Sequence, residues 1–423
     1  MQFLLFLFYN LLVYPIFFFY ISLLSLFSKK IRDGFVGRFQ TIKILKHYFN
    51  KNNINPDIYW LHCSSYGEYL QIDPVINIIK KKKIDCTIIV SFFSPSGMNN
   101  VKNKNIDCKV YMPFDFYYSV NNVFNIAKPK IIIFSSADLW YNFIYNAKNK
   151  NIDMILIGAK SKNYFENKLN LFHHIFKPLY RPFKKVYTIN KNDVDAYDSY
   201  IGSHKTSHLG NPRYDQVFIS STKIYEKNKM PIDKRKNILL LASMHNQDRN
   251  IILPSLVQYM KKNESLEVYW ISHEPSSQEN KYLESILSRQ GISSEVINSL
   301  EEMHNCTMRV KILNIIGVLA ELYWHAKIAY VGGGFSTGVH NLMEPAVAGV
   351  PTFFGPKYQS FDEAIQIVNN EAGFVIKKGS DLIDKIDLLL NKRDKIILAS
   401  SKAYKIIKKN IGSSEKLVEE IIS

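Results

Sequence analysis

The stretch Val331–Pro356, VGGGFSTGVHNLMEPAVAGVPTFFGP, has the pattern of a glycine-rich loop and a helix between two strands. The apolar run Ile328–Val331 is typical of a buried parallel strand, and it leads into three glycines, which allow a tight turn and the close approach of a ligand. The Ala-rich run after Glu344 predicts a helix, and Pro351–Phe354 predicts a second strand. A helix that begins just after a glycine turn offers unpaired N–H groups to a phosphate, and Glu344 would suit the hydroxyls of a ribose. The pattern therefore predicts a nucleotide site, although glycine turns also join strands to helices where no ligand binds.

The length and composition favour two domains and anionic partners. A chain of 423 residues exceeds the usual size of one domain. The formal charge of +17 favours phosphates, nucleic acid or an acidic membrane face, although the excess of lysine could also reflect genomic composition. The four cysteines show neither a CxxC pair nor zinc spacing, which indicates reduced thiols in a cytoplasmic compartment and no metal site.

Residues 1–28 are almost wholly apolar and predict a membrane anchor. The run is too long for a cleaved signal peptide and has no early basic region or small-residue cleavage site. Lys29, Lys30 and Arg32 follow at once, so the positive-inside rule places the rest of the chain in the cytoplasm. A helix that lies in the membrane interface is the alternative to a spanning one. Further cations, which either meet acidic headgroups or form an ordinary solvated face, follow at Arg38, Lys43 and Lys46.

The rest of the chain alternates between strand-like and helix-like runs, which predicts an α/β fold with parallel sheets. Strands are expected at 58–62, 86–92, 109–112, 131–134, 154–157 and 185–189, and again at 238–241, 267–271, 294–297, 310–313, 328–331 and 352–354. We therefore expect two Rossmann-like domains, 29–218 and 237–423, joined by a linker at 219–236. Two such domains in tandem imply a cleft between them, with ligands at the carboxyl ends of the strands. A last helix, 401–422, could pack back onto the first domain.

Three side chains of the first domain are candidates for chemistry. Glu68 falls in the first turn of a helix, where the helix dipole favours negative charge and a general base could sit; such an acid can also serve only to stabilise the helix. Asp138 follows the fourth strand, either as a second active-site acid or as a helix N-cap. Arg213 could bind a phosphate or carboxylate, or pair with Asp215.

In the second domain, polar or glycine-rich loops follow several strands, and we expect them to share one sheet edge. A nucleotide there would meet backbone N–H groups, hydroxyls and imidazoles. These loops carry His245 and His340 together with the candidate donor-binding residues Ser243, His273, Glu274, Ile316, Gly317, Val318, Gly333, Asn341, Leu342, Met343 and Glu344.

Taken together, the motifs resemble the Kdo transferases, which add 3-deoxy-D-manno-oct-2-ulosonic acid (Kdo) to the lipid A precursor. The resemblance extends over nearly the whole chain in the right order. It starts with the apolar N-terminus and continues through Trp60–Glu68, Ser94–Gly97, Pro113–Asp115, Gly210–Asp215, Gly332–Phe335, His340–Ala346 and Phe354–Pro356.

The resemblance implies a GT-B-type glycosyltransferase without metal or other cofactor. Its donor would be CMP-Kdo, held in the second domain, and its acceptor lipid IVA at the cytoplasmic face of the inner membrane. It implies that Glu68 deprotonates the acceptor hydroxyl in an inverting displacement, with Asp138 and Arg213 supporting the transition state. The cytidine nucleotide would be held by His273, Ile316–Val318 and Asn341–Glu344.

The chain departs from the family pattern at several places. Asp138 replaces a glutamate, Val318 an acid, and Ser272-His273 an Arg-His pair, and an arginine common after the fifth strand has only Lys160 or Lys162 as a counterpart. Two competing hypotheses remain: a two-domain glycosyltransferase that uses a UDP- or ADP-sugar, and a basic membrane-bound nucleic-acid-binding protein. No recognised nucleic-acid-binding module supports the latter.

Overall fold

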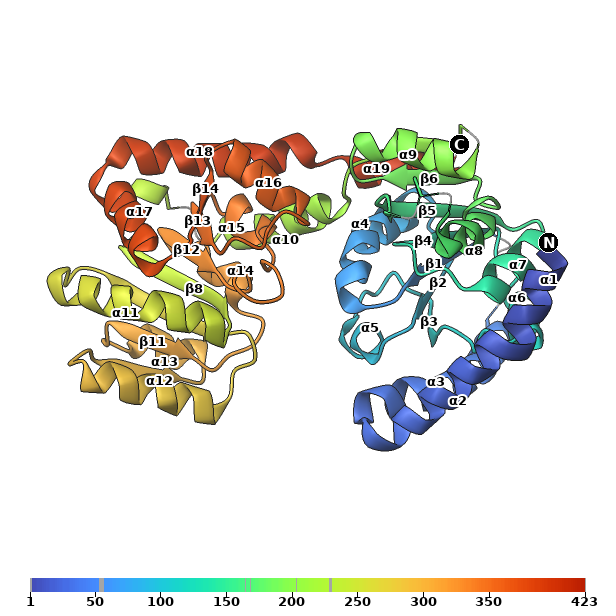
Figure 1. The fold of residues 1–423 in the computed structure, drawn as a ribbon, viewed down its shortest axis with the longest axis horizontal. Coiled ribbons are helices and arrows are strands. Elements are labelled where there is room, and N and C mark those ends of the chain that lie inside the picture. Colours follow the sequence, from blue (N-terminus) through green and yellow to red (C-terminus); the bar gives the residue numbers. More distant parts are fainter. Residues whose placement is uncertain are drawn as a thin grey trace. The chain divides into compact units, whose positions relative to one another are not determined.

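The computed structural model describes residues 2–52, 57–163, 165–167, 169–202, 204–227 and 230–422. It divides into two compact units. The first comprises Met1–Gln216 and Gly412–Ser423, and the second Val217–Ile411. Each unit is a parallel sheet covered by helices (Figure 1).

The sheet of the first unit has seven strands in the order β3-β2-β1-β4-β5-β6-β7. All neighbouring strands are parallel. The strand order reverses between β1 and β4, and ligands of doubly wound sheets bind at such a point. The strands are β1 (Ile58–Cys63), β2 (Thr87–Phe92), β3 (Cys108–Tyr111), β4 (Ile131–Phe134), β5 (Asp153–Ala159), β6 (Lys185–Thr188) and β7 (Thr206–His208).

Alternate residues of these strands point to opposite faces, so the sheet carries two apolar cores. Trp60, on one face, belongs to the core that includes Phe124 and Phe143. Leu61, on the other face, packs in the core that includes Leu417 near the end of the chain. The covering helices are α4 (Tyr66–Lys82), α5 (Pro95–Asn100), α6 (Tyr117–Ala127), α7 (Tyr141–Asn149), α8 (Leu171–Tyr180), α9 (Asn192–Ile201) and α19 (Ser413–Ile422).

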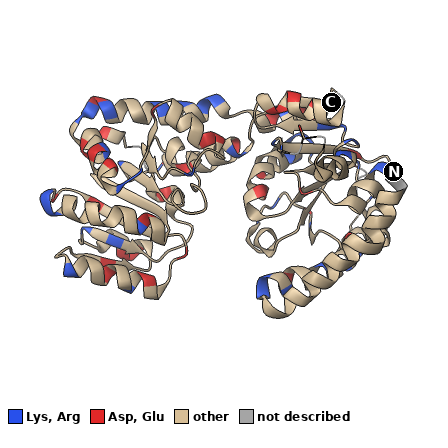
Figure 2. Cartoon of the chain, viewed as in Figure 1, with Lys and Arg blue, Asp and Glu red and all other residues tan. Residues whose placement is uncertain are grey.

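The N-terminal apolar segment is helical and continues into a second, basic helix. It consists of α1 (Gln2–Phe8), the π-helical segment η1 (Tyr9–Val13) and α2 (Tyr14–Phe27), after which α3 (Lys29–Lys51) runs back beside α2 (Figure 1). Leu4–Phe27, with a mean hydropathy of 2.1, is long and apolar enough to cross a membrane. Figure 2 shows almost no charged residues along α1 and α2.

The second unit repeats the architecture with the order β10-β11-β9-β8-β12-β13-β14. Its strands are β8 (Ile238–Met244), β9 (Glu267–Ser272), β10 (Ser294–Ile297), β11 (Val310–Leu313), β12 (Ile328–Val331), β13 (Thr352–Phe354) and β14 (Gly373–Val375). Its helices are α10 (Arg213–Tyr225), which begins in the first unit, the 3₁₀ turn η2 (Ile232–Lys234), α11 (Asn246–Lys262), α12 (Ser277–Arg289), α13 (Leu300–Asn305), α14 (Leu319–Leu322), α15 (Met343–Val347), α16 (Asp362–Asn369), α17 (Gly379–Asn391) and α18 (Arg393–Asn410).

Two expectations about elements are wrong. The predicted linker 219–236 contains most of α10 and all of η2, and the buried Arg235 holds it to the second unit by donating to the carbonyls of Tyr323, Ala326 and Ala348. The predicted last helix is two helices, which separate at Gly412 with a φ of 104°. The predicted helix after the glycine turn is present as α15, but it begins only at Met343 and is short.

Candidate active site

Glu68 lies where the strand order of the first unit reverses, and three donors hold its carboxylate. The hydroxyl of Ser65 caps the start of α4, which places Glu68 in the first helical turn. One oxygen of Glu68 accepts from the N–H of Ser64 (2.5 Å) and from the hydroxyl of Ser64 (2.8 Å). The other oxygen accepts from the hydroxyl of Ser136 (2.8 Å), in the loop after β4. Helix capping explains the first two bonds, but it does not require the third.

Asp138 is not the N-cap of α7, because that position belongs to Trp140. One carboxylate oxygen lies 3.2 Å from Nε2 of His62, and the other accepts from the indole N–H of Trp140 at 3.1 Å. The side chain of Asp138 is 25% exposed. Two N–H donors therefore fix the direction of the Asp138 carboxylate, which is partly open to solvent.

His62, which the sequence motif contained but which we assigned no role, is part of a buried chain of hydrogen bonds. The indole N–H of Trp60 donates to the hydroxyl oxygen of Ser91 (2.8 Å), which lies 2.9 Å from Nδ1 of His62. If Ser91 donates to Nδ1, then His62 carries its proton on Nε2 and donates it to Asp138. With this tautomer, each of the polar groups of Trp60, Ser91 and His62 has a hydrogen-bond partner. The sequence gave little indication of this role for His62, because the role depends on the strand register that pairs His62 with Ser91.

Arg213, at the start of α10, is not paired with Asp215. The carboxylate of Asp215 instead accepts from the N–H groups of Gly412 (2.5 Å) and Ser414 (2.8 Å), where the chain enters α19. The Nε of Arg213 is buried and has no hydrogen-bond partner in the part of the chain that the structure describes. Its guanidinium is therefore a candidate donor to an anion.

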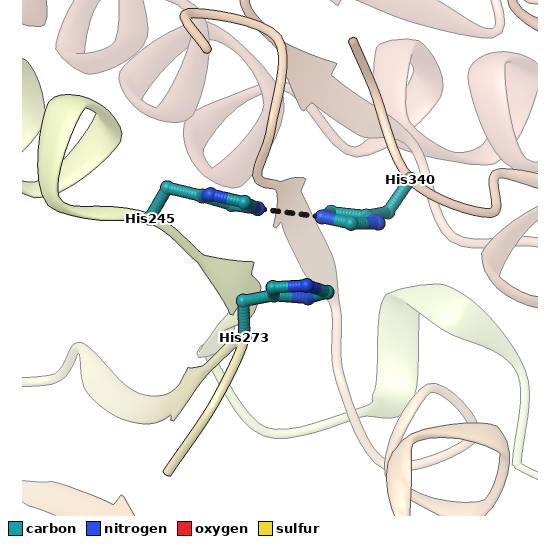
Figure 3. A group of neighbouring side chains, drawn as sticks. All are labelled: His245, His273 and His340. Carbon is teal, nitrogen blue, oxygen red and sulfur yellow. Dashed lines mark hydrogen bonds between the residues drawn. The ribbon is translucent and has the colours of Figure 1, made fainter. Parts of the chain in front are cut away.

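In the second unit, three histidines meet at the carboxyl ends of three neighbouring strands. His245 follows β8, His273 follows β9 and His340 lies in the loop after β12 (Figure 3). The Nε2 atoms of His245 and His340 face each other at 2.7 Å, and the planes of these two rings differ by 16°. The ring of His273 packs against both, with centroid distances of 4.5 and 4.4 Å. We call these three residues the histidine trio.

The buried Asp248 in the first turn of α11 fixes the loops that carry the trio. One of its oxygens accepts from the N–H of His245 (3.1 Å) and the N–H of Gly333 (2.9 Å). The other accepts from the hydroxyl of Tyr330 at 2.8 Å. The sequence pattern gave no sign of this residue, because its three partners come from two separate parts of the chain.

The glycine turn is built for close backbone contact rather than as an open phosphate cradle. A Cβ at Gly332 would lie 2.2 Å from the carbonyl oxygen of Ser243, and Gly333 has a φ of 90°, which favours glycine. The N–H of Gly332 donates to Ala242, and that of Gly333 to Asp248. These two N–H groups are therefore already used. Ser243 itself has a φ of 51°, in the left-handed region that serine adopts at a cost of about 1–2 kcal/mol.

The other predicted donor-binding residues divide into buried and accessible ones. Leu342 and Met343 are buried, so their side chains belong to the core. The amide of Asn341 donates to the carboxylate of Glu344 at 2.9 Å, and both are partly exposed. Ile316, in the loop after β11, is 87% exposed beside Gly317 and Val318, and Glu274 is exposed after β9. The strands that carry these loops, β9, β11 and β12, belong to one sheet, in which β8 lies between β9 and β12.

Among the described residues, the trio is the group of His, Cys, Asp and Glu side chains whose ligand atoms lie close enough together for a metal ion, within 4.8 Å of one another. The arrangement fits a hydrogen bond better. An ion with bonds of about 2.0–2.1 Å in tetrahedral geometry would hold two nitrogens about 3.3 Å apart. The 2.7 Å contact between His245 and His340 is instead the length of an N–H···N bond.

Comparison with known proteins identifies sequence relatives of this chain. Residues 36–216 match the family model described as 3-deoxy-D-manno-octulosonic-acid transferase (kdotransferase). The 3-deoxy-D-manno-octulosonic acid transferase of Aquifex aeolicus is 26% identical over 361 residues, which cover 84% of this chain and 92% of that protein. The enzyme of the same name from Chlamydophila psittaci is 26% identical over 342 residues, or 78% and 77% of the two chains.

A solved structure with the same fold is UDP-GlcNAc 2-epimerase from Neisseria meningitidis bound to UDP-GlcNAc. It is 13% identical, has a TM-score of 0.60, and the alignment covers 86% of this chain and 99% of that one. The two parallel sheets and the sequence matches together define a glycosyltransferase of the GT-B type. Within that class the chain is similar in sequence to the Kdo transferases, over residues 36–216 by the family model and over most of its length by the individual relatives.

Proposed function

We propose that the protein transfers Kdo from CMP-Kdo to lipid IVA with inversion, and that Glu68 is the general base. The observation that carries the proposal is the carboxylate of Glu68, which three donors from two loops hold at the point where the strand order reverses. The related proteins named above, which are Kdo transferases, support the choice of sugar.

In the proposed reaction, an acceptor hydroxyl oxygen attacks the anomeric carbon of Kdo as the bond from that carbon to the CMP phosphate breaks. The hydroxyl proton passes to Glu68, and CMP leaves as an anion. A positioned base accelerates such a step by roughly 10²–10⁴. Asp138 would orient the acceptor hydroxyl, and Arg213 would offset negative charge on the departing phosphate.

For the donor, the exposed loops of the second unit offer the groups that a cytidine nucleotide needs. The exposed side chain of Ile316, beside the exposed Gly317, offers an apolar contact to a base, and the hydrogen-bonded pair Asn341 and Glu344 suits ribose hydroxyls. Leu342 and Met343 could contribute only backbone groups, because their side chains are buried. The chain itself would thus bind the donor through residues at the ends of β11 and β12.

The N-terminal helices would attach the enzyme to the inner membrane, with the catalytic units on the cytoplasmic side. One face of α1, η1 and α2 packs on the first unit: the hydroxyl of Tyr9 donates to the buried Asp115 (2.8 Å), and Phe17 packs on Trp140 with a centroid distance of 5.5 Å. The opposite face exposes Leu4, Phe8, Leu11, Leu12, Ile16, Phe19, Leu23, Leu26 and Phe27. A helix docked in this way cannot be surrounded by lipid, which favours one that lies in the membrane surface.

The basic residues next to this apolar surface divide into two kinds. Lys29, Lys30, Lys43 and Lys46 are exposed and would meet acidic headgroups. Arg38 is buried, stacks on Phe93 at 4.1 Å and donates to its carbonyl, so the prediction that Arg38 contacts headgroups is wrong. Because Phe17 touches Trp140, and Trp140 donates to Asp138, the membrane-facing helices lie beside the proposed acceptor site.

The test is transfer from CMP-Kdo to tetraacyl lipid A precursor, followed by product mass, for the native chain and Glu68→Gln. We expect the variant to lose roughly 10²–10⁴ in turnover. Glu302 is a matched control, since it also accepts from a preceding backbone N–H (Asn298, 2.7 Å) in the first turn of a serine-capped helix. Glu302→Gln should lose only the capping energy. Undiminished turnover by Glu68→Gln would remove Glu68 as the base.

Competition between CMP, UDP and ADP tests the donor independently of the base. The proposal expects CMP to bind most tightly. A preference for UDP or ADP would favour a glycosyltransferase with a different nucleotide-sugar, and the fold alone is compatible with that alternative.

A further inference from the structure

The histidine trio lacks the fixed positive charge that an anion site usually carries. Ser272 precedes His273 at the position where the motif of the resembling family has an arginine. The groups of the trio that can become positive are imidazoles, whose charge depends on pH.

In the present arrangement His245 and His340 cannot both be charged. A hydrogen bond between two Nε2 atoms at 2.7 Å needs one N–H donor and one lone pair. If both rings were protonated, two N–H groups would point at each other. The structure therefore shows the trio in a state of low charge, with one proton between these two rings.

The electrostatics agree with this geometry. Burial, and then the nearby charges of His273 and His245, lower the pKa of His340 to about 4. Burial, and then His245, lower the pKa of His273. The acidic groups that oppose these effects are Asp248, which faces His340 from α11, and Glu274, which follows β9 next to His273. Near neutral pH, His340 and His273 are consequently uncharged in the free protein.

We infer that the trio is a proton-coupled anion site, which binds the phosphate of the cytidine nucleotide together with a proton. The inference rests on the proposed function, which supplies the nucleotide. An anion beside the rings favours their charged forms and offsets the repulsion between them. The N–H···N bond between His245 and His340 then breaks, and each ring can donate an N–H to the phosphate. Binding thus replaces a bond within the trio with charge-assisted bonds to the ligand.

The sign of the pH dependence follows from the protonation. The complex holds more protons than the free protein, so the affinity for the nucleotide falls as the pH rises. One proton per ligand changes the dissociation constant by at most about tenfold per pH unit. A site with arginine in place of the imidazoles would show no such dependence near neutral pH.

The experiment is calorimetric titration of the full-length protein with CMP between pH 7.0 and 8.5, in two buffers of different ionisation enthalpy, neither of them phosphate. In this range the second ionisation of a phosphomonoester, with a pKa of about 6, is nearly complete and adds little. We expect uptake of up to one proton per CMP and a dissociation constant that rises about three- to tenfold per pH unit. Cytidine, which lacks the phosphate, should bind without proton uptake.

His245→Gln and His340→Gln should bind CMP more weakly and with little proton uptake, whereas His204→Gln, at an exposed histidine of the first unit, should behave as the native chain does. The imidazole resonances of the native protein provide a check that needs no variant: the pKa of His340 should rise when CMP is added.

Tight CMP binding without proton uptake would overturn the inference and leave the proposed function intact. Failure to bind CMP at any pH, with binding of UDP or ADP, would instead count against the proposed donor. A titration with ZnCl₂ tests whether the trio is instead a metal site. Tight zinc binding that is lost in His340→Gln would show a metal site and overturn the proton-coupled anion site.

Discussion

At the scale of single residues, the proposed acceptor site depends on His62, whose buried ring places Nε2 3.2 Å from the partly exposed carboxylate of Asp138. We predict that His62→Ala lowers turnover about 10- to 100-fold, because Asp138 loses one of its two N–H donors and its orientation. His62→Gln should restore much of the loss, since its amide can still donate to Asp138. The measurement is kcat and the KM for the donor, which should change far less than kcat.

Ser91 tests the same chain of hydrogen bonds from its other end. In Ser91→Ala, Nδ1 of His62 loses the hydroxyl that favours the tautomer with the proton on Nε2. Turnover should then fall in the same direction as in His62→Ala, with the KM for the donor little changed. Unchanged turnover in Ser91→Ala, or equal losses in the Gln and Ala variants of His62, would contradict this positioning role.

At the scale of elements, two glycines in α3 form a natural pair for testing how that helix docks. A Cβ at Gly37 would lie 2.2 Å from the ring of Tyr111, whereas a Cβ at Gly34 would only reach van der Waals contact, 3.4 Å from Pro95. Gly37→Ala should therefore destabilise the first unit by about 1–3 kcal/mol through overpacking. Gly34→Ala should be neutral or stabilise by up to about 1 kcal/mol, because alanine favours the helix.

Urea unfolding in mild detergent measures both changes, and flotation with anionic vesicles reports on membrane attachment. If the two variants unfold alike, Gly37 of α3 does not lie against Tyr111 of β3.

Asp115 links the N-terminal helices to the start of α7, and its titration gives a pH prediction. It accepts from the N–H groups of Asn142 (2.9 Å) and Phe143 (2.8 Å) and from the hydroxyl of Tyr9, and burial raises its pKa to about 7. Between pH 4 and 7 the native state keeps a proton that the unfolded chain releases. The contribution of Asp115 to stability therefore falls as the pH rises, by at most about 1.4 kcal/mol per unit.

We predict that Asp115→Asn removes this fall of the unfolding free energy with pH, measured by urea unfolding at pH 5, 6, 7 and 8. Asp195→Asn, at an exposed carboxylate of α9, should leave the pH dependence unchanged. The same pH dependence of the unfolding free energy in Asp115→Asn and in the native protein would contradict the raised pKa.

The sequence predicted elements well where apolar runs were long. Each of the twelve expected strands is present, because buried parallel strands are continuous apolar runs. The two missed strands, β7 and β14, are three-residue edge strands, and β7 is polar (Thr206-Ser207-His208). The linker was wrong for a related reason: the part of α10 that falls in it, residues 219–225, is mostly Ser, Thr, Lys and Tyr, so its apolar pattern is weak.

The sequence predicted which loops of the second unit lie together, but not the side-chain contacts between them. The carboxyl ends of parallel strands must share one edge, which suffices to bring His245, His273 and His340 together. Their hydrogen bond, and the role of Asp248 behind them, depend on side-chain directions that neither spacing nor composition encodes. The roles assigned to Glu68, Asp138 and Arg213 remain predictions.

At the scale of the whole molecule, the chain leaves the first unit once and returns to it for its last residues. The return is specific. Asp215 accepts from Gly412 and Ser414, Ser413 donates to the carbonyl of Leu209 (3.0 Å), and the hydroxyl of Tyr187 donates to Glu420. The first unit is therefore completed by residues about 200 positions away in sequence, after the second unit has been made. Such long-range closure predicts that the first unit reaches its full stability only after the whole chain is synthesised.

Leu417 tests this closure, because its side chain is fully buried in the core beneath β1 and α4 although it lies near the end of the chain. Leu417→Ala should destabilise the first unit by about 2–5 kcal/mol, the range for a leucine cavity in a core. Lys416→Ala, at its exposed neighbour, should change stability by about 0.5 kcal/mol or less. Fluorescence of chains that keep only Trp60 and Trp140, with Trp270 and Trp324 replaced by Phe, reports on the first unit alone. A transition that shifts for Leu417→Ala but not for Lys416→Ala would show that α19 belongs to the fold of the first unit. Unchanged transitions for both variants would mean that the first unit does not need this helix.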